Sequence, residues 1–272
     1  IIPKDRLDLI NILRFSSNYS IETYFIGSGS NILFSDNKMD GIVISPLKSL
    51  RNLKIYRNMI IAESGVMLGK MVKESIKSGL TGLESLIGVP GTLGGALSMN
   101  AGAYGSEISN HLISVEMMSM NGEIKSYPKN QLQFSYRTSN FKSNEFILEA
   151  KFHLDSDSIE KIKIRTKKTS SSRKENQPLR YRSAGSVFKN SSKYPAGYLI
   201  DNVGLKGLKS GDAQISTKHA NFIVNHGKAK ATDILKLIKI IKQRVFEKHK
   251  ILLELEIKTF GFKPNDIEQM NI

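Results

Sequence analysis

Short apolar runs alternate with clusters of Gly, Ser, Asn and Asp over much of the first half of the chain. Runs of this length, bounded by turn-forming residues, are typical of β-strands. Residues 68–78 instead have apolar positions at helical spacing and end at Gly79, a common helix C-cap. Asn121-Gly122 predicts a hairpin turn. The predicted strands are Thr23–Ile26, Ile32–Phe34, Ile42–Ser45, Met59–Ala62, Leu112–Met120 and Phe146–His153.

The second half of the chain has a different texture and begins with a basic stretch. Residues 156–176 predict an exposed helix, followed by a linker that ends near Pro178. Phe222–Asn225 and Ile251–Thr259 are predicted strands. Ala231–Lys248 is the clearest helix, because its apolar residues gather on a single face. The residues of that face are Ile234, Leu235, Ile238, Ile241 and Val245.

The composition is that of a globular protein and excludes several classes of site. The chain has 272 residues, of which 40% are hydrophobic and 24% charged, enough for two domains. No apolar run reaches about 18 residues, and no basic region precedes an apolar core at the start, so neither a membrane span nor a secretory signal is expected. Cysteine is absent, which excludes thiolate chemistry and fits a reducing cytoplasm. The histidines lack ligand spacing, so no metal site is expected.

The net charge is strongly positive, with 40 basic and 25 acidic residues giving +15. One interpretation is binding to nucleic acid, and a second is attraction of anionic small molecules. A third is that lysines cover solvated faces. The third is favoured, because the basic residues form no long block and no aromatic RNA-binding signature accompanies them.

Two glycine-rich segments are candidates for phosphate binding. Gly27–Asn31 reads GSGSN, and small residues there let the backbone approach a ligand. Its spacing is not that of the dinucleotide fingerprint, so a tight turn is the alternative. Residues 87–105 read IGVPGTLGGALSMNAGAYG and predict a turn at Val89-Pro90-Gly91 before a short helix near Leu93–Met99. Free N–H groups at that helix start would suit a diphosphate, and glycines that serve packing are the alternative.

These two loops, in this order, resemble the UDP-N-acetylenolpyruvoylglucosamine reductase family. The resemblance extends over most of the chain, from about residue 21 to residue 261. The other segments that carry it are SYRTSNF at 135–141, SAGSVFKN at 183–190, GLKGLKSGDAQISTKHANFIVN at 204–225 and LELEIKTFG at 253–261.

The resemblance implies an α+β fold, in which a vanillyl-alcohol-oxidase/PCMH-type FAD-binding domain precedes a smaller α+β substrate-binding domain. The expected limits are 1–154 for the two-lobed FAD-binding domain, 155–178 for a helix and linker, 179–262 for the substrate-binding domain and 263–272 for a tail. The short connection from Tyr194 to Leu199 favours the compact type II subtype. The initiator Met and the family's early Arg-x-Gly-Gly element are missing, so we expect the natural chain to extend upstream. Leu255 also stands where the family often has proline.

The implied reaction uses bound FAD and NADPH to reduce the enolpyruvyl group of a UDP-sugar. Hydride goes from NADPH to flavin N5 and then to the terminal carbon, and a proton arrives at the neighbouring carbon. The resemblance assigns the proton to Ser186 and the stabilisation of carboxylate charge to Arg137, whose guanidinium suits a carboxylate. Glu256 is the third catalytic residue, and needs a partner such as Arg137 if it is buried. Glu254 has the same strand parity and is its competitor.

The resemblance also indicates binding residues. For FAD they are Gly27, Ser28, Gly29, Ser30, Asn31, Gly88, Pro90, Gly91, Gly94, Asn100, Ala101 and Gly102. For the substrate they are Tyr136, Lys189, Asn190 and His219, with Asn221 as a weaker candidate. We expect a cytoplasmic monomer that binds neither nucleic acid nor membrane. The alternatives are another FAD oxidoreductase of the same fold and, from a different class, a basic nucleic-acid-binding protein without catalysis.

Overall fold

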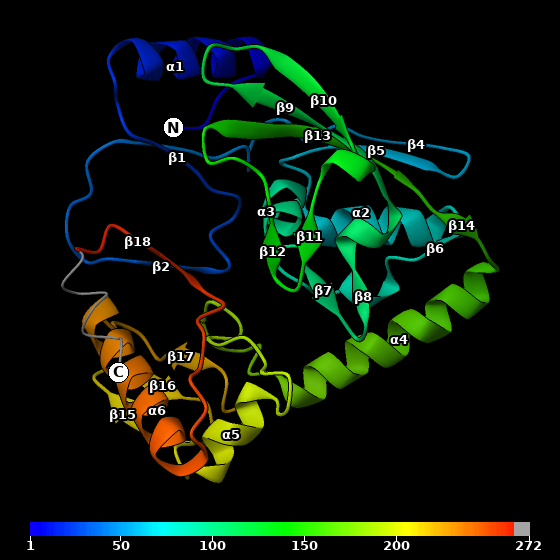
Figure 1. Ribbon diagram of the computed structural model, residues 1–272. Helices are drawn as coiled ribbons and strands as arrows, with labels where there is room; N and C mark the ends of the chain where they lie inside the picture. The colour runs from blue at the N-terminus through cyan, green and yellow to red at the C-terminus, as the bar shows by residue number, and fades with distance from the viewer. Residues whose placement is uncertain (264–272) are drawn as a thin grey trace. The chain divides into compact units, whose positions relative to one another are not determined.

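The computed structural model describes residues 1–263, which form two compact units (Figure 1). The first unit contains Ile1–Ser28 and Gly41–Ser172, and the second contains Gly29–Asp40 and the chain from Arg173 onward. The predicted tail at 263–272 lies outside the described residues from 264 on. Within residues 1–263, no helix is long and apolar enough to cross a membrane.

An antiparallel sheet of five strands is the framework of the first unit, in the order β10-β9-β13-β5-β4. Alternate residues of β13 from Phe146 to Phe152 are buried, as expected for a strand with one face on the core. Asn121-Gly122 turns the chain between β9 and β10, and Gly122 has a φ of 86°. The bounds of the strands are β4 Leu53–Tyr56, β5 Met59–Glu63, β9 Leu112–Ser119, β10 Ile124–Pro128 and β13 Glu145–His153.

Helices and short strand pairs complete the first unit. The helices are α1 Arg6–Asn18, α2 Leu68–Lys77, α3 Leu93–Ser98 and α4 Ile159–Asn176. Helix α4 continues beyond Ser172, the last residue of this unit. Short 3-10 turns occur at Glu84–Leu86, Ile108–His111 and Lys129–Gln131. The pairs are β1 Thr23–Phe25 with β3 Ile42–Ile44, β6 Leu80–Thr81 with β14 Asp155–Ser156, β7 Gly102–Ala103 with β8 Ser106–Glu107, and β11 Phe134–Ser135 with β12 Thr138–Ser139. The strands predicted in the first half of the chain and the helix before Gly79 are confirmed to within two residues at each end.

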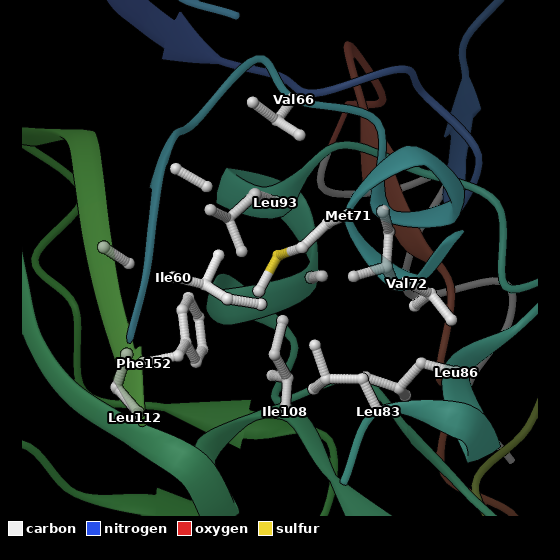
Figure 2. Close-up of a cluster of buried hydrophobic side chains, with 14 of the residues drawn as sticks. Ile60, Val66, Met71, Val72, Leu83, Leu86, Leu93, Ile108, Leu112 and Phe152 are labelled. Atoms are coloured by element: carbon white, nitrogen blue, oxygen red, sulfur yellow. The ribbon is translucent and has the colours of Figure 1, made fainter. Parts of the chain in front are cut away.

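The core between this sheet and its helices also anchors the second glycine-rich loop. Figure 2 shows side chains of the sheet, of α2 and of α3 pointing toward one another, with Met71 and Leu93 among them. Leu86 and Leu97 flank the glycines of that loop in sequence and are fully buried in the same cluster. Burying a large aliphatic side chain contributes roughly 1.5–3 kcal/mol. The loop therefore lies on a packed base although it contains little regular structure.

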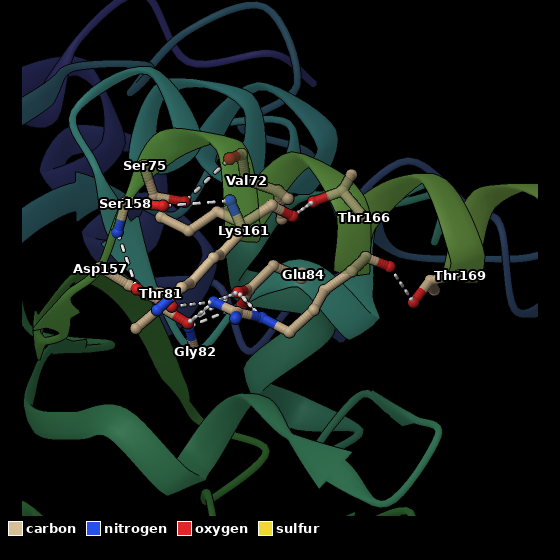
Figure 3. A network of polar contacts seen from close by, with 12 residues as sticks. Val72, Ser75, Thr81, Gly82, Glu84, Asp157, Ser158, Lys161, Thr166 and Thr169 are labelled. Carbon is tan, nitrogen blue, oxygen red and sulfur yellow. Dashed lines mark hydrogen bonds and ion pairs between the residues drawn. The ribbon is translucent and has the colours of Figure 1, made fainter.

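A polar network joins α4 to the turn before Glu84 (Figure 3). The Glu84 carboxylate is 8% exposed and accepts hydrogen bonds from Thr81 Oγ1 at 2.7 Å, Gly82 N at 2.6 Å and Arg165 Nε at 3.0 Å. Arg165 also pairs with Asp157 at 2.8 Å. Burial opposes ionisation of Glu84, but these hydrogen bonds outweigh burial and lower its pKa.

The second unit contains one small sheet, a parallel strand pair and two helices among its described residues. Its elements are β2 Ile32–Phe34, α5 Ala196–Asn202, β15 Lys209–Ser210, β16 Ala213–Ile215, β17 Ile223–Asn225, α6 Ala231–His249 and β18 Lys258–Phe260. β15, β16 and β17 form an antiparallel sheet, and β2 pairs in parallel with β18. The predicted α6 is confirmed, with Leu237 fully buried where the sequence pattern favoured Ile234 and Leu235, which are half-buried.

The segment 29–40 groups with the second unit, whereas the sequence placed it in the first domain. The reason is long-range pairing: Ile32–Phe34 lies beside Lys258–Phe260, and the Asp36 carboxylate accepts a hydrogen bond from Ala231 N at the start of α6. The grouping also extends the first unit to Ser172, along α4, rather than to 154. Contacts between residues so far apart in the chain leave no local signal in the sequence.

The predicted strand at Ile251–Thr259 is wrong over most of its length. In the described chain only Lys258–Phe260 belongs to a strand there, and Leu255 forms an isolated bridge with Phe188. No single strand runs beside the whole segment among the described residues, because Glu256 N donates to Val187 O whereas Lys258 N donates to Asn31 O, in a different part of the chain. An apolar pattern reports burial, and it does not report whether a partner strand is present.

The Glu84 network predicts a pH dependence of stability. Because the folded-state pKa of Glu84 lies below its ordinary value of 4.5, its contribution to the free energy of unfolding is complete above that value and is lost as pH falls through the folded pKa. Glu84→Gln should therefore lower stability at pH 7 and remove part of the loss below pH 4.5. Urea unfolding from pH 7 to pH 3 measures this, with Glu74→Gln as a surface control. Parallel curves for wild type and Glu84→Gln would contradict the prediction.

Candidate active site

The first unit contains the beginning of the GSGSN loop, where only glycine fits against α3. A Cβ on Gly27 would lie 2.4 Å from Thr92 Oγ1 and 3.7 Å from Gly95 Cα. Ser45 Oγ donates a hydrogen bond to Gly27 O at 2.9 Å, which holds the backbone just after β1. Ser28 Oγ is buried and has no hydrogen-bond partner among residues 1–263. The loop thus brings its backbone against the second glycine-rich segment, as close approach requires.

The start of α3 does not offer the free N–H groups that the sequence suggested for a diphosphate. Leu93 N donates to Val66 O at 2.8 Å, Gly94 N donates to Ser64 O at 2.9 Å, and Gly95 N donates to Thr92 Oγ1 at 3.4 Å. Thr92, as N-cap, completes the set. Protein acceptors already occupy the groups that a phosphate would use. The helix-start hypothesis is therefore wrong for α3.

The individual glycines of this second loop have separate reasons to be glycine. Gly88 and Gly91 have φ values of 74° and 133°, which side chains rarely adopt. Gly94 packs against Ser64, and a Cβ there would lie 3.0 Å from Ser64 Cβ. Packing and turn geometry account for these glycines, and their contact with FAD stays a prediction, as does that of Pro90.

Asn100 joins this loop to the hairpin that carries Arg137. Its side chain is fully buried, and Nδ2 donates to Glu107 Oε2 at 2.6 Å and to Ser135 O at 3.0 Å. Arg137 Nη2 donates to Gly102 O at 2.9 Å, and its guanidinium lies 4.8 Å from the centre of the Tyr136 ring. The structure therefore brings Asn100, Ala101 and Gly102 together with Tyr136 and Arg137.

The second unit brings Ser186 and Glu256 onto neighbouring stretches of backbone. Glu256 N donates to Val187 O at 2.9 Å, one residue after Ser186. On its other side, Glu256 O accepts a hydrogen bond from Asn31 Nδ2 at 3.0 Å. Asn31, predicted to contact FAD, thus also holds the chain at Glu256. Gly29, Ser30 and Asn31 belong to this unit by their contacts.

The two glutamates near the end of the chain differ in their surroundings. Glu254 has a side chain that is 73% exposed and pairs with Lys189 Nζ at 2.5 Å. Glu256 is half-buried, and its main chain is bound on both sides. This difference favours Glu256 as the catalytic residue and gives Glu254 a role beside Lys189.

Asn190 and His219 both lie next to α5. Asn190 Oδ1 accepts a hydrogen bond from Ala196 N at the first turn of that helix. His219 packs edge-on against Phe222, with ring centres 4.9 Å apart, and close to Gly197. Burial lowers the pKa of His219, and the positive charge of Lys206 acts in the same direction. A neutral imidazole at pH 7 follows, with Nδ1 accepting from the main chain of Asn221 at 3.3 Å.

The sequence missed the role of Thr92 and did not predict the contacts that Asn221 makes. Thr92 caps α3, and its position directly before a helical run was an available signal. Asn221 was a weak substrate candidate, but its amide binds the main chain of Phe188 through both ends. No sequence signal indicates that partner, because the two residues are 33 positions apart. In the described chain, no group of three or more His, Cys, Asp or Glu residues is arranged to hold a metal ion.

Comparison with known proteins defines the class first. Residues 1–127 match the FAD binding domain family, and residues 177–260 match the C-terminal domain of UDP-N-acetylenolpyruvoylglucosamine reductase. The α+β fold, with an FAD-binding domain followed by a smaller domain, is that of a flavin-dependent oxidoreductase.

The particular family follows from whole-chain relatives. The reductase of Caldanaerobacter subterraneus subsp. tengcongensis is 41% identical over 96% of this chain and 87% of its own length. That of Clostridioides difficile is 41% identical over 95% of this chain and 86% of its own. The crystal structure of the Thermus caldophilus enzyme matches with a TM-score of 0.81 at 34% identity, over 96% of this chain and 91% of that one. The chain belongs to the UDP-N-acetylenolpyruvoylglucosamine reductase family, which uses FAD and NADPH.

The polar groups of the first unit fit a bound FAD. The buried Ser28 Oγ and Asn100 Oδ1 have no protein partner within residues 1–263, and such groups are costly unless a ligand or water satisfies them. Gly27 lets the chain approach the start of α3 closely. The predicted FAD residues Gly27, Ser28 and Asn100 therefore have features that a polar ligand would explain.

The contact at Gly27 predicts a specific loss of cofactor. Gly27→Ala places a methyl group against the Thr92 hydroxyl that caps α3, so the loop must shift away. We expect FAD affinity to fall by at least about tenfold, equivalent to about 1.4 kcal/mol. Flavin fluorescence during titration of apoprotein measures it. Gly69→Ala, where a Cβ meets nothing within 4 Å, is the matched control, and equal affinity in both variants would contradict the prediction.

The half-buried imidazole of His219 predicts acid sensitivity. The folded-state pKa of His219 is below its ordinary 6.5, so the unfolded chain takes up the proton more readily. Stability should therefore fall as pH drops from about 6.5 to the folded-state pKa, with a slope of at most about 1.4 kcal/mol per pH unit. His219→Gln should remove this part of the slope in unfolding measured from pH 8 to pH 5. His153→Gln, at an exposed position, controls for losing an imidazole, and an unchanged slope in His219→Gln would disprove the assignment.

Proposed function

We propose that this chain reduces UDP-N-acetylglucosamine enolpyruvate to UDP-N-acetylmuramate, a step in the synthesis of peptidoglycan precursors. The observation that carries the proposal is the backbone link between the Ser186 loop and Glu256, in a chain that matches the family over 96% of its length. The match of the C-terminal domain argues against a different oxidoreductase of the same fold. The same match argues against a nucleic-acid-binding role. The positive charge does not favour that role, because it suits an anionic sugar nucleotide equally well.

The overall reaction adds one hydride and one proton to a carbon–carbon double bond. FAD, when bound, would supply the hydride-transfer chemistry that links NADPH to the enolpyruvyl double bond. The protein has to supply a proton to the neighbouring carbon and to stabilise the negative charge that spreads onto the carboxylate. NADPH, a proton and the enol ether thereby become NADP⁺ and the lactyl ether.

Ser186 is proposed as the proton donor. A serine hydroxyl is a weak acid, so it serves only where the accepting carbon is strongly basic and the hydroxyl is well placed. The preceding Gly185 has a φ of 78°, which turns the chain just before Ser186. The following residues, from Val187 on, are bound to Glu256 and to Asn221. A hydroxyl at the junction of a turn and a fixed backbone has a defined direction.

Arg137 is proposed to hold the substrate carboxylate. Its guanidinium is always cationic and has five N–H donors in a planar fork. Binding to Gly102 O and stacking on Tyr136 restrict its rotamers, so that little side-chain entropy is lost when a carboxylate binds. We propose that Tyr136 contributes to the same surface.

Lys189, Asn190 and His219 are proposed to bind the uridine diphosphate. The Lys189–Glu254 pair is exposed on the Glu254 side, and such pairs contribute about 0–1 kcal/mol. A diphosphate can therefore replace Glu254 at low cost. We further propose the compact type II subtype, a monomeric state and a cytoplasmic location, which fit the short Tyr194–Leu199 connection and the absence of cysteine.

The proposal predicts separable half-reactions. The purified protein should be yellow and should bleach when NADPH is added without oxygen. Ser186→Ala should bleach at nearly the wild-type rate, whereas reoxidation by the enolpyruvyl substrate should slow by about 10²–10⁴-fold, the range of a lost general acid. Stopped-flow absorbance measures both steps, with the exposed Ser192→Ala as control. A Ser186→Ala protein that fails to bleach would refute the role of Ser186 as proton donor. A colourless wild-type protein would refute the proposed FAD-dependent reduction.

A further inference from the structure

Asn221 makes the hydrogen bonds that a neighbouring strand would otherwise make to residues 187 and 188, directly after Ser186. Its side chain is 3% exposed, and Oδ1 accepts from Phe188 N at 2.9 Å while Nδ2 donates to Phe188 O at 2.8 Å. Its main-chain oxygen accepts from Val187 N at 2.9 Å. An amide side chain carries one acceptor and two donors, which here match both main-chain groups of one residue.

The opposite edge of the same segment is bound to the end of the chain. Val187 O accepts from Glu256 N at 2.9 Å, and Lys189 N donates to Glu254 O at 2.8 Å. Residues 187–189 therefore lie between Asn221 on one edge and residues 254–256 on the other. The segment has no continuous strand partner in the described chain, so Asn221 supplies the hydrogen bonds of one whole edge.

We propose that Asn221 is a positioning residue that sets the geometry of Ser186 relative to Glu256 during proton delivery. The inference rests on the proposed role of Ser186. Gly185 lies on the other side of Ser186, with a φ of 78°, and apart from its chain neighbours no described atom lies within 4 Å of a Cβ added there, so no packing contact at Gly185 adds to the hold on the serine. The direction of the hydroxyl depends on the segment that follows it. The contacts of Asn221 are to main chain, so it acts through Ser186 and Glu256.

The chain provides a matched control in the same unit. Asn225 Oδ1 accepts hydrogen bonds from Gly227 N at 2.8 Å and Ala229 N at 3.2 Å, in the turn that precedes α6. Asn221→Ala and Asn225→Ala each remove an asparagine that binds main chain. They differ in whether the bound segment adjoins Ser186.

The test measures both half-reactions in the FAD-loaded variants. Asn221→Ala should slow reoxidation by the enolpyruvyl substrate by about 10–100-fold, because small displacements of a reacting group cost rates of this order. Bleaching by NADPH should change by less than about twofold. Asn221→Asp retains the acceptor for Phe188 N but places a buried carboxylate oxygen, which cannot donate, against Phe188 O, and should slow the same step at least as much. Asn225→Ala should leave both steps within about twofold of wild type.

Hydrogen–deuterium exchange gives a second readout that needs no substrate. Peptides covering 186–190 should exchange faster in Asn221→Ala than in wild type, and should be unchanged in Asn225→Ala. If Asn221→Ala does not fold, Asn221→Asp is used for both measurements.

The outcomes separate this inference from the proposed function. If wild-type flavin is not reoxidised by the enolpyruvyl substrate, the proposed function fails and this inference fails with it. If wild type and Ser186→Ala behave as proposed but the Asn221 variants match Asn225→Ala, only the role of Asn221 is overturned. Equal slowing of both half-reactions in the Asn221 variants would also overturn it, because it indicates general loosening of the fold.

Discussion

Irregular backbone has to find its hydrogen-bond partners outside helices and sheets, and in each unit the segments that carry the predicted site residues depend on this constraint. Three asparagines meet it. Asn100 binds the Arg137 hairpin at Ser135, Asn31 binds the main chain at Glu256, and Asn221 binds both main-chain groups of Phe188. A carboxamide carries its acceptor and its donors on two separate atoms, so one side chain can bind an N–H and a C=O at once, whereas an ionised carboxylate carries acceptors only. Each catalytic segment is thus held by an amide from elsewhere in its unit.

The same constraint determines which groups remain for ligands. The first N–H groups of α3 are occupied by Val66, Ser64 and Thr92, so the helix start serves the fold. Ser28 Oγ and Asn100 Oδ1, by contrast, are among the buried side-chain atoms that have no hydrogen-bond partner within residues 1–263. A polar cofactor satisfies such atoms and recovers a free energy of about 1–3 kcal/mol for each. The proposed contacts of FAD with these atoms would couple cofactor binding to folding of the first unit.

In the second unit, exposure separates residues that look equivalent in the sequence. Glu254 and Glu256 share a short apolar stretch, yet Glu254 reaches solvent beside Lys189 and Glu256 is half-buried with its main chain fixed. Neighbouring groups act more strongly on a half-buried carboxylate than on an exposed one, because water screens it less, and this suits a catalytic role. The exposed pair suits the exchange of partners that binding an anionic substrate requires.

The sequence by itself determined the local elements: the short strands of the first half, the helix before Gly79 and the amphipathic α6, because periodicity and turn chemistry act over a few residues. Its motifs also identified the family, and they predict Ser186, Arg137 and Glu256 as its catalytic residues. Only the tertiary structure decided that Ile32–Phe34 joins the second unit and that, within residues 1–263, Ile251–Ile257 has no strand partner beyond the Leu255–Phe188 bridge. It also decided that protein acceptors occupy the first N–H groups of α3 and that Asn221 holds Phe188. Each of these depends on which atoms meet across a large separation in the chain. That information is carried by packing and hydrogen-bond satisfaction of the whole unit, and no local pattern contains it.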